Sequence, residues 1–288
     1  MARRKLDGLI VVITGASQGI GRALALESLK KGMKVVAAAR SADLLYDLAA
    51  EAKPIGQGAL ATVVGDITKP EGRKAILEGA VQNFGGVDIL VNNAGVGATG
   101  HFAEGSEDRL RKIMEVNYFA LAEITRIFIP ELKKTKNAAI VNISSIAGKR
   151  GIPARSDYSA SKFAVQGFSN ALRPELAKDN IDVLVICPGL TQTNFSKNMI
   201  EQKAKLQMDH LRGMTSEEVA MHTLRSMETG RQEVCLTRDG RLMAFVSRFF
   251  PRLADRIAKK RVIALFREEI AERQKRRQEL LSQNVQHA

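Results

Sequence analysis

Thr14-Gly-Ala-Ser-Gln-Gly-Ile-Gly21 is the stretch that decides the fold, because it follows an apolar run at 9–13 and opens a segment with helical spacing. Glycines in such a turn bring backbone N–H groups to the amino end of a helix, where negative charge is stabilised. The spacing of Gly15, Gly19 and Gly21 departs from the usual G-x-G-x-x-G, and a glycine turn alone also fits a plain tight turn. Its place between a strand and a helix predicts a pyrophosphate-binding turn.

Short apolar runs recur along the chain, each followed by a segment with helical spacing. This alternation predicts parallel strands joined by crossover helices, and nearly continuous apolar strands predict helices on both faces of the sheet. We therefore expect an α/β fold, with one Rossmann-like doubly wound domain and a central parallel sheet of about seven strands. The expected strands are 9–13, 34–39, 60–64, 87–91, 138–143, 181–187 and 233–237.

The 288-residue chain has a net charge of +13, which is unevenly distributed. Residues 241–288 carry 12 Lys and Arg against 5 Asp and Glu, a net +7, and the other 240 residues carry 32 against 26, a net +6. After Pro251, apolar residues recur at helical spacing among these cations, which predicts a basic amphipathic helix. We expect one domain at 1–240 and a helical C-terminal extension at 241–288.

Composition excludes several classes of protein. Cys187 and Cys235 lie far apart in sequence without partners at metal-ligand spacing, which predicts a reduced, cytoplasmic protein without a disulfide framework or metal site. No apolar run approaches the roughly 18 residues of a membrane-spanning helix. The tail lacks the aromatic interleaving of a nucleic-acid-binding segment. Two alternatives remain for 241–277: peripheral contact with an anionic membrane surface, or packing against the sheet domain or a second subunit.

The ends of the second, third and fourth expected strands carry candidate cofactor contacts. Arg40 follows the second strand, where no carboxylate is present to accept a hydrogen bond from a ribose 2′-hydroxyl. Its guanidinium suits a 2′-phosphate, which favours NADP over NAD, although a solvated loop arginine is the alternative. Asp66 suits an adenine amino group but equally a turn, and Ala94 and Gly95 are small enough for close approach of a cofactor. Asn93 equally fits a structural amide.

The fifth expected strand ends in the hydroxyls of Ser144 and Ser145, and Tyr158 and Lys162 follow four positions apart. Residues four apart lie on one face of a helix. A neighbouring cation favours the phenolate of a tyrosine, whose ordinary pKa of about 10 is too high for a base at neutral pH. An isolated Tyr-x3-Lys is usually a surface pair, but the glycine turn and Ser145 favour acid/base chemistry.

In this order and spacing, these motifs, together with Asn92 to Gly95, Asn117 and Pro188-Gly189, resemble the short-chain dehydrogenase/reductase family over residues 7–240. The resemblance implies hydride transfer between NADP and a carbonyl or secondary alcohol, with Tyr158 exchanging the proton. It implies catalytic roles for Asn117, Ser145, Tyr158 and Lys162, with a water at Asn117. The implied cofactor-binding residues are Gly15, Ser17, Gln18, Gly19, Ile20, Gly21, Arg40, Asp66, Ile67, Asn93, Ala94, Gly95, Tyr158, Lys162, Pro188, Gly189 and Thr191.

The resemblance also implies a substrate lid at about 191–215, whose methionines and Phe195 suit an apolar, adaptable pocket. A segment packed permanently as core is the alternative. We expect a lipid, steroid or long-chain ketone as substrate, and a homodimer or homotetramer joined through the helices that carry Asn117 and Tyr158. A cofactor-binding sensor or scaffold without turnover is the alternative function. Such proteins usually lack the serine, tyrosine or lysine, and all are present here.

Overall fold

The computed structural model describes residues 3–55, 59–202, 213–267, 271–276 and 279. The chain forms two compact units, 1–241 and 242–288. The expected lid residues Leu206, Met208 and Leu211 lie outside the described residues.

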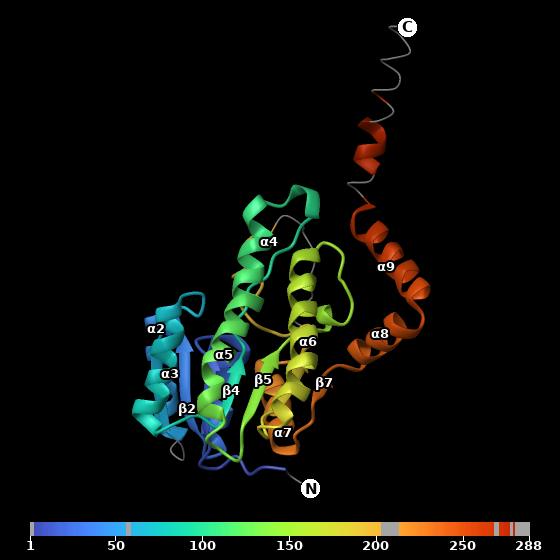
Figure 1. Cartoon of the computed structure of the whole chain (residues 1–288). Helices are drawn as coiled ribbons and strands as arrows, with labels where there is room; N and C mark the ends of the chain where they lie inside the picture. Colours follow the sequence, from blue (N-terminus) through green and yellow to red (C-terminus); the bar gives the residue numbers. More distant parts are fainter. Residues whose placement is uncertain (1–2, 56–58, 203–212, 268–270, 277–278, 280–288) are drawn as a thin grey trace. The chain divides into compact units, whose positions relative to one another are not determined.

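Within the described residues, seven parallel strands form one sheet in the order β3-β2-β1-β4-β5-β6-β7 (Figure 1). Strands β2 and β3 are added on one side of β1, and β4 to β7 on the other. At such a change between β1 and β4, a doubly wound sheet opens a crevice for a ligand. The expected fold class is confirmed. The strands are β1 (Ile10–Thr14), β2 (Lys34–Ala39), β3 (Ala59–Val64), β4 (Ile89–Asn92), β5 (Ala139–Ile143), β6 (Asp182–Cys187) and β7 (Glu233–Cys235).

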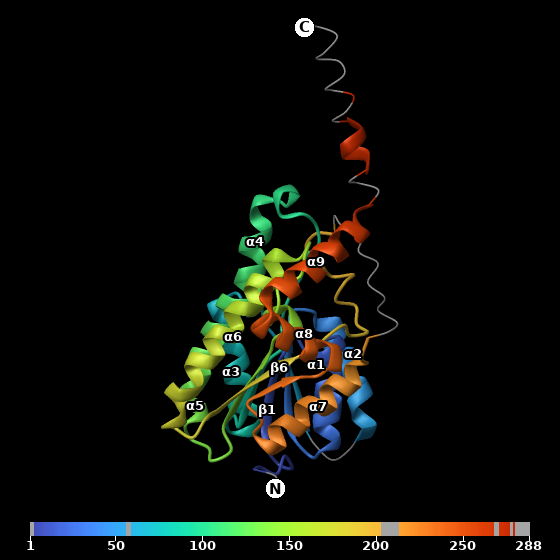
Figure 2. The ribbon, with the colours of Figure 1, turned by 90° about the vertical axis from the view of Figure 1, so that its right-hand side faces the viewer.

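Helices cover both faces of the sheet (Figure 2). Each inner strand alternates its side chains between two cores. In β1, Val11 and Ile13 pack into one core, whereas Val12 packs into the other. Helices α1 (Gly19–Lys30), α2 (Ala42–Ala52) and α7 (Ser216–Thr229) cover the first core, and α3 (Pro70–Phe84), α5 (Ala120–Leu132) and α6 (Ser156–Ala177) cover the second. The remaining short segments of this unit are α4 (Glu107–Met114), the π-helical turn η3 (Glu115–Phe119), and the 3-10 turns η1 (Lys53–Ile55), η2 (Phe102–Glu104) and η4 (Ile146–Gly148).

The last strand is shorter than the apolar run at 233–237 predicts. β7 ends at Cys235, and the Thr237 hydroxyl accepts a hydrogen bond from the Gly240 amide at 3.1 Å. A threonine that accepts such a bond caps the amino end of a helix, so the chain leaves the sheet at this point. Helix α8 (Arg238–Phe249) consequently begins three residues before position 241, where the composition changes.

The C-terminal unit contains the later turns of α8, then α9 (Pro251–Leu265), with proline at the first helical position, where its missing N–H costs nothing. Large apolar side chains remain exposed in this unit, and the rings of Phe245 and Phe249 lie 4.8 Å apart between centroids. Among the described residues, no helix combines the length and the apolar character that crossing a membrane requires. The exposed apolar side chains are Leu242, Phe245, Phe249, Phe250, Leu253, Ile257 and Ile263.

Candidate active site

A cleft with a volume of about 630 Å³ opens at the carboxyl ends of the strands. It brings the glycine turn after β1 together with the ends of β2, β4, β5 and β6 and the start of α6. Three of the expected site residues, Gly21, Asn117 and Pro188, are not among the residues that line it. The expected site residues that line the cleft are Gly15, Ser17, Gln18, Gly19, Ile20, Arg40, Asp66, Ile67, Asn93, Ala94, Gly95, Ser145, Tyr158, Lys162, Gly189 and Thr191.

The backbone of the glycine turn adopts conformations that other residues rarely take. Gly15 has a φ of +64° and Gly19 a φ of +53°. A Cβ atom on Gly15 would lie 2.8 Å from the Cα atom of Ala94, so space as well as conformation excludes a side chain. The residue before α1, Gln18, provides no side-chain cap for the first N–H groups of the helix. The turn and these N–H groups therefore suit the pyrophosphate of a dinucleotide.

Gly21 and Asn93 hold this turn against β4. A Cβ atom on Gly21 would overlap the Gly15 carbonyl oxygen and the Asn93 side-chain nitrogen. Asn93 Nδ2 donates hydrogen bonds to the carbonyl oxygens of Thr14 at 3.0 Å and Gly15 at 3.1 Å. Asn93 is thus a structural amide that also lines the cleft.

The nucleotide end of the cleft contains one exposed cation and one carboxylate with a local partner. Arg40 is exposed at the end of β2 and lines the cleft. Asp66 Oδ1 accepts hydrogen bonds from the Thr68 amide at 2.9 Å and the Thr68 hydroxyl at 2.8 Å. Asp66 therefore stabilises a turn and also lines the cleft, so the two roles that the sequence left as alternatives are compatible.

Ser145, Tyr158 and Lys162 meet where β5 faces α6. The hydroxyl groups of Ser145 and Tyr158 share a hydrogen bond. Lys162 Nζ lies 5.8 Å from the centroid of the Tyr158 ring and donates a hydrogen bond to the Ile143 carbonyl at 2.9 Å. Lys162 is 4% exposed and Tyr158 is 9% exposed, so both groups sit in a dry environment in which electrostatic effects are strong.

Burial controls the protonation of these groups. It raises the pKa of Tyr158, against the opposing effects of the Ser145 hydrogen bond and the Arg155 guanidinium. Burial also lowers the pKa of Lys162 to about 8. Arg155, three residues before Tyr158, is thus a cation that lowers the Tyr158 pKa, and the effect that the four-residue spacing predicts for Lys162 stays a prediction.

Asn117 lies fully buried in the π-helical turn between α4 and α5. Its Nδ2 donates to the Val96 carbonyl and to the Ser161 hydroxyl, each at 2.9 Å, and its Oδ1 accepts from the Val96 amide at 2.8 Å. A Cβ atom on Gly95 would lie 3.2 Å from Asn117 Oδ1 and 3.7 Å from Lys162 Nζ. Asn117 thus fixes the loop after β4 beside Lys162, and the expected water at Asn117 stays a prediction.

Two further cleft residues lie close to Tyr158. Arg155 lines the cleft immediately before α6, after Ala154 with its positive φ of 58°. The ring of Phe195 lies 5.7 Å from that of Tyr158 between centroids. Arg155 precedes Tyr158 by three positions, the spacing of helix neighbours, and this signal could have identified it.

A buried ion pair joins the described part of the lid to the start of α6. Arg109 of α4 contacts Asp157 Oδ2 at 2.5 Å and Glu201 Oε2 at 3.4 Å. The Glu201 carbonyl also accepts a hydrogen bond from the Thr99 amide at 3.0 Å. Arg109 therefore connects three chain segments around the residue that precedes Tyr158, and no motif in the sequence indicated it. Among the described residues, no group of three or more His, Cys, Asp or Glu side chains could hold a metal ion.

Solved structures with the same fold hold nicotinamide dinucleotides. A short chain dehydrogenase/reductase from Burkholderia phymatum in complex with NAD has a TM-score of 0.80 and 26% sequence identity, over 87% of this chain and 96% of that one. The 3-ketoacyl-(acyl-carrier-protein) reductase of Brucella melitensis complexed with NADH has a TM-score of 0.71 and 28% identity, over 80% of this chain and 95% of that one.

Sequence relatives extend over most of the chain. Dehydrogenase/reductase SDR family member 7B of Mus musculus is 36% identical over 269 residues, which cover 89% of this chain and 83% of that protein. An uncharacterized oxidoreductase of Bacillus subtilis, YxnA, is 33% identical over 89% of this chain and 73% of that protein. The model of the short chain dehydrogenase family matches residues 9–204, from β1 through the cleft to the first part of the lid. With this match and these relatives, the chain belongs to the short-chain dehydrogenase/reductase family of oxidoreductases.

Proposed function

We propose that this oxidoreductase uses NADP to interconvert a carbonyl group and a secondary alcohol. The observation that carries the proposal is that Ser145, Tyr158 and Lys162 line the same cleft as the glycine turn. A bound nicotinamide dinucleotide supplies or accepts the hydride. A sensor or scaffold with this fold would not need a buried proton donor beside the cofactor-binding turn.

The protein's own residues move and hold the proton. In reduction, Tyr158 gives its phenol proton to the substrate oxygen while the Ser145 hydroxyl hydrogen-bonds that oxygen as negative charge develops. Because burial raises the pKa of Tyr158, the phenol keeps its proton at neutral pH and can donate it when a carbonyl is reduced. Lys162, whose pKa is about 8, remains mostly charged at pH 7 and keeps a cation beside the phenol ring.

The preference for NADP depends on Arg40. The end of β2 gives the cleft Ala38, Ala39, Arg40 and Ser41 but no carboxylate, and a guanidinium forms charge-assisted hydrogen bonds with a phosphate. The two solved neighbours hold NAD and NADH, so the nucleotide must be tested directly.

The test is a fluorescence titration of NADPH and NADH into wild type and Arg40→Ala. We expect tighter binding of NADPH by the wild type, and a loss of roughly tenfold or more in the variant, because a hydrogen bond to a charged group contributes about 1.5–3 kcal/mol. NADH binding should change little. Equal affinities of the wild type for both nucleotides would refute the NADP assignment.

Apolar side chains around Tyr158 support a hydrophobic ketone as substrate. Val96, Leu190, Phe195 and Met199 line this part of the cleft. A flexible methionine adapts to ligands of different shape. We expect kcat/KM to rise with the apolar size of the ketone and Met199→Gln to reduce that dependence. A flat series across ketones of increasing size would contradict the substrate class.

Exposed aromatic side chains on the helices that carry Asn117 and Tyr158 support a homodimer or homotetramer. Phe119 is 51% exposed and Phe163 is 46% exposed. Burying apolar area is the main driving force of subunit association. Light scattering should find an oligomer in the wild type and smaller species in Phe163→Glu, whereas a monomeric wild type would contradict this proposal.

The C-terminal unit supports a peripheral contact with an anionic membrane. Leu242, Phe245 and Phe249 are exposed at spacings of three and four in α8. Residues 242–267 contain seven Lys and Arg but one acidic residue, Asp255. Apolar side chains flanked by cations suit the interface of an anionic bilayer. The two free thiols support a cytoplasmic protein. The proposed contact would hold this protein at a membrane surface.

Vesicle sedimentation tests the membrane contact. Wild type should bind vesicles of phosphatidylcholine with phosphatidylserine, and less strongly those of phosphatidylcholine alone, because each nearby cation contributes about 1 kcal/mol on an anionic surface. The double variant F245S/F249S should lose the binding, and Tyr46→Ser, at an exposed site on α2, should retain it. Binding that is equal in all three proteins would contradict insertion of the apolar face.

A further inference from the structure

The two cysteines of the chain lie opposite each other on neighbouring strands. Cys187 at the end of β6 is the register partner of Cys235 at the end of β7, and both thiols are free. Neighbouring strands lie about 4.8 Å apart, whereas disulfides join Cα atoms about 4.4–6.8 Å apart. Register partners also direct their side chains to the same face of a sheet. A bond between the two sulfur atoms is therefore within reach of the native backbone.

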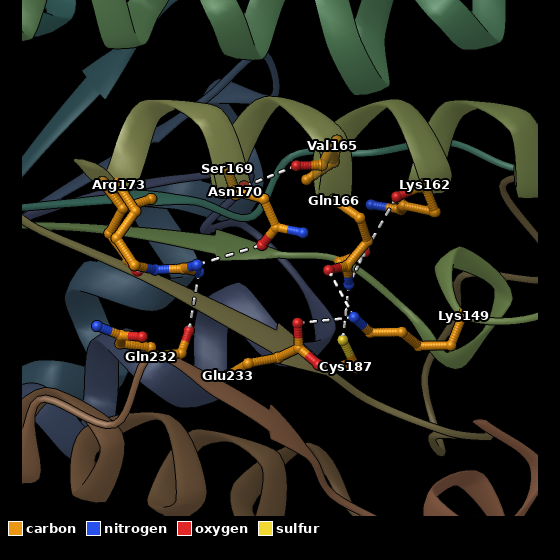
Figure 3. Close-up of polar contacts among 12 residues, drawn as sticks. Lys149, Lys162, Val165, Gln166, Ser169, Asn170, Arg173, Cys187, Gln232 and Glu233 are labelled. Carbon is orange, nitrogen blue, oxygen red and sulfur yellow. Dashed lines mark hydrogen bonds and ion pairs between the residues drawn. The ribbon is translucent and has the colours of Figure 1, made fainter. Parts of the chain in front are cut away.

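Polar side chains lie near the Cys187 thiol on the α6 side of the sheet (Figure 3). Gln166 Nε2 donates a hydrogen bond to Cys187 Sγ at 2.9 Å, and Gln166 Oε1 accepts one from Lys149 Nζ at 2.9 Å. Lys149 also pairs with Glu233 of β7 at 2.7 Å. The Cys187 sulfur therefore contacts a side-chain amide, and that amide is in turn held by a lysine ammonium.

The two thiols differ in access and in acidity. Cys187 is fully buried, whereas Cys235 is partly exposed at the edge strand of the sheet. The hydrogen bond with Cys187 lowers the pKa of the Cys235 thiol, and Lys149 and Arg241 act in the same direction. The same hydrogen bond and burial raise the pKa of Cys187. Because the thiolate is the reactive form, Cys235 is the thiol that an oxidant meets first.

We propose that Cys187 and Cys235 form a dithiol that hydrogen peroxide converts into an intramolecular disulfide. The Cys235 thiolate attacks one peroxide oxygen, the O–O bond breaks, and the departing hydroxide takes a proton to become water, which leaves Cys235 as a sulfenic acid. Cys187 then loses its proton and attacks the Cys235 sulfur, the S–O bond breaks, and a second water leaves. Two thiols are oxidised to one disulfide while one peroxide is reduced to two waters.

The bond would tie the edge strand of the sheet to the strand that leads into the cleft. Cys187 directly precedes Pro188 and Gly189, and Gly189 lines the cleft. The inference goes beyond the proposed oxidoreductase function and needs neither substrate nor cofactor for its test.

Peptide mapping of the full chain after treatment with hydrogen peroxide tests the dithiol. Without reductant, we expect the free thiols to fall from two per chain to none and a peptide that links 187 to 235, about 2 Da lighter than the sum of its reduced halves. Peptides are measured rather than the intact mass because the nine methionines also take up oxygen. Two remaining thiols, or links only between chains, would overturn the proposal.

Single variants test which thiol reacts first. In Cys187→Ser, Cys235 should stop at the sulfenic acid and be trapped by dimedone. In Cys235→Ser, the buried Cys187 should stay reduced under the same exposure. Faster oxidation of Cys187 than of Cys235 would overturn the assigned order. Circular dichroism of both variants checks that neither thiol becomes accessible because the protein has unfolded. If Cys187→Ser does not fold, Cys187→Ala takes its place.

Discussion

The glycine turn after β1 and the start of α6 line one cleft, but different forces hold them. The turn depends on backbone geometry, because Gly15 has a positive φ and lies against Ala94. Tyr158 and Lys162 depend on burial and on hydrogen bonds to Ser145 and Ile143. Substitutions that add atoms should therefore disrupt the turn. On the α6 side, substitutions that remove a charge or a proton donor should have large effects even when they leave the side-chain shape nearly unchanged.

The largest effect is expected from Tyr158→Phe. This change keeps the ring against Phe195 but removes the proton donor, and acid/base catalysis contributes about 10²- to 10⁴-fold to a rate. Turnover of NADPH with a ketone should fall by that factor. Tyr118→Phe, outside the cleft lining, is the matched control and should keep its rate. Retained turnover in Tyr158→Phe would remove the assigned acid/base.

Lys162→Met should change how stability depends on pH. The folded-state pKa of Lys162, about 8, lies below its ordinary value of 10.5, so between these pH values the unfolded chain binds more protons. Stability of the wild type should rise with pH in this window, by roughly 3 kcal/mol from this group. Urea unfolding at several pH values should find this rise missing in the variant. Parallel curves would contradict the burial of a titrating ammonium.

Gly15→Ala tests the backbone side of the comparison. Alanine would have to adopt the left-handed conformation of Gly15 at a cost of about 1–3 kcal/mol, and its Cβ would also overlap Ala94. We expect lower stability and at least about tenfold weaker cofactor binding. Gly8→Ala is the control, because Gly8 also has a positive φ but nothing within 4 Å of the added atom. If both variants bind cofactor equally, contact with Ala94 is irrelevant to the turn.

The smallest expected effect is that of Arg155→Gln on the pH profile. The Arg155 guanidinium lowers the Tyr158 pKa, so its removal should raise that pKa further. In alcohol oxidation, which needs the phenolate, the rising limb of the profile should move to higher pH. Arg150→Gln, which removes a cation outside the cleft lining, should leave it in place. A shift to lower pH would show that Arg155 does not act on Tyr158.

The fold was predictable because parallel strands have a strong sequence signal. β1, β2 and β6 are apolar except for one terminal residue each, and the strands were located to within two residues at either end. The glycine turn was predictable for a related reason, since a backbone that excludes side chains restricts the residue type itself. The early start of α8 depends on a single capping hydroxyl, that of Thr237, which periodicity does not register.

The electrostatics of the site were harder to predict. The spacing of Tyr158 and Lys162 placed both on α6, but the effect of each charge depends on burial and on neighbours from other elements. Arg155 enters the cleft because the chain turns at Ala154, and Arg109 reaches Asp157 only after α4 packs against α6. Such contacts form between residues that only the folded chain brings together, so no local sequence pattern predicts them.

Transfer of deuterium from cofactor to product is the most direct test of hydride transfer from NADPH to a ketone. NADPH labelled with deuterium at both positions of the nicotinamide C4 would be incubated with the wild type and a panel of hydrophobic ketones, followed by mass spectrometry of the alcohols. We expect one deuterium per alcohol formed with the wild type and almost no alcohol with Tyr158→Phe. Binding of NADPH without deuterium in any product would contradict this hydride transfer, and would favour a cofactor-binding sensor or scaffold.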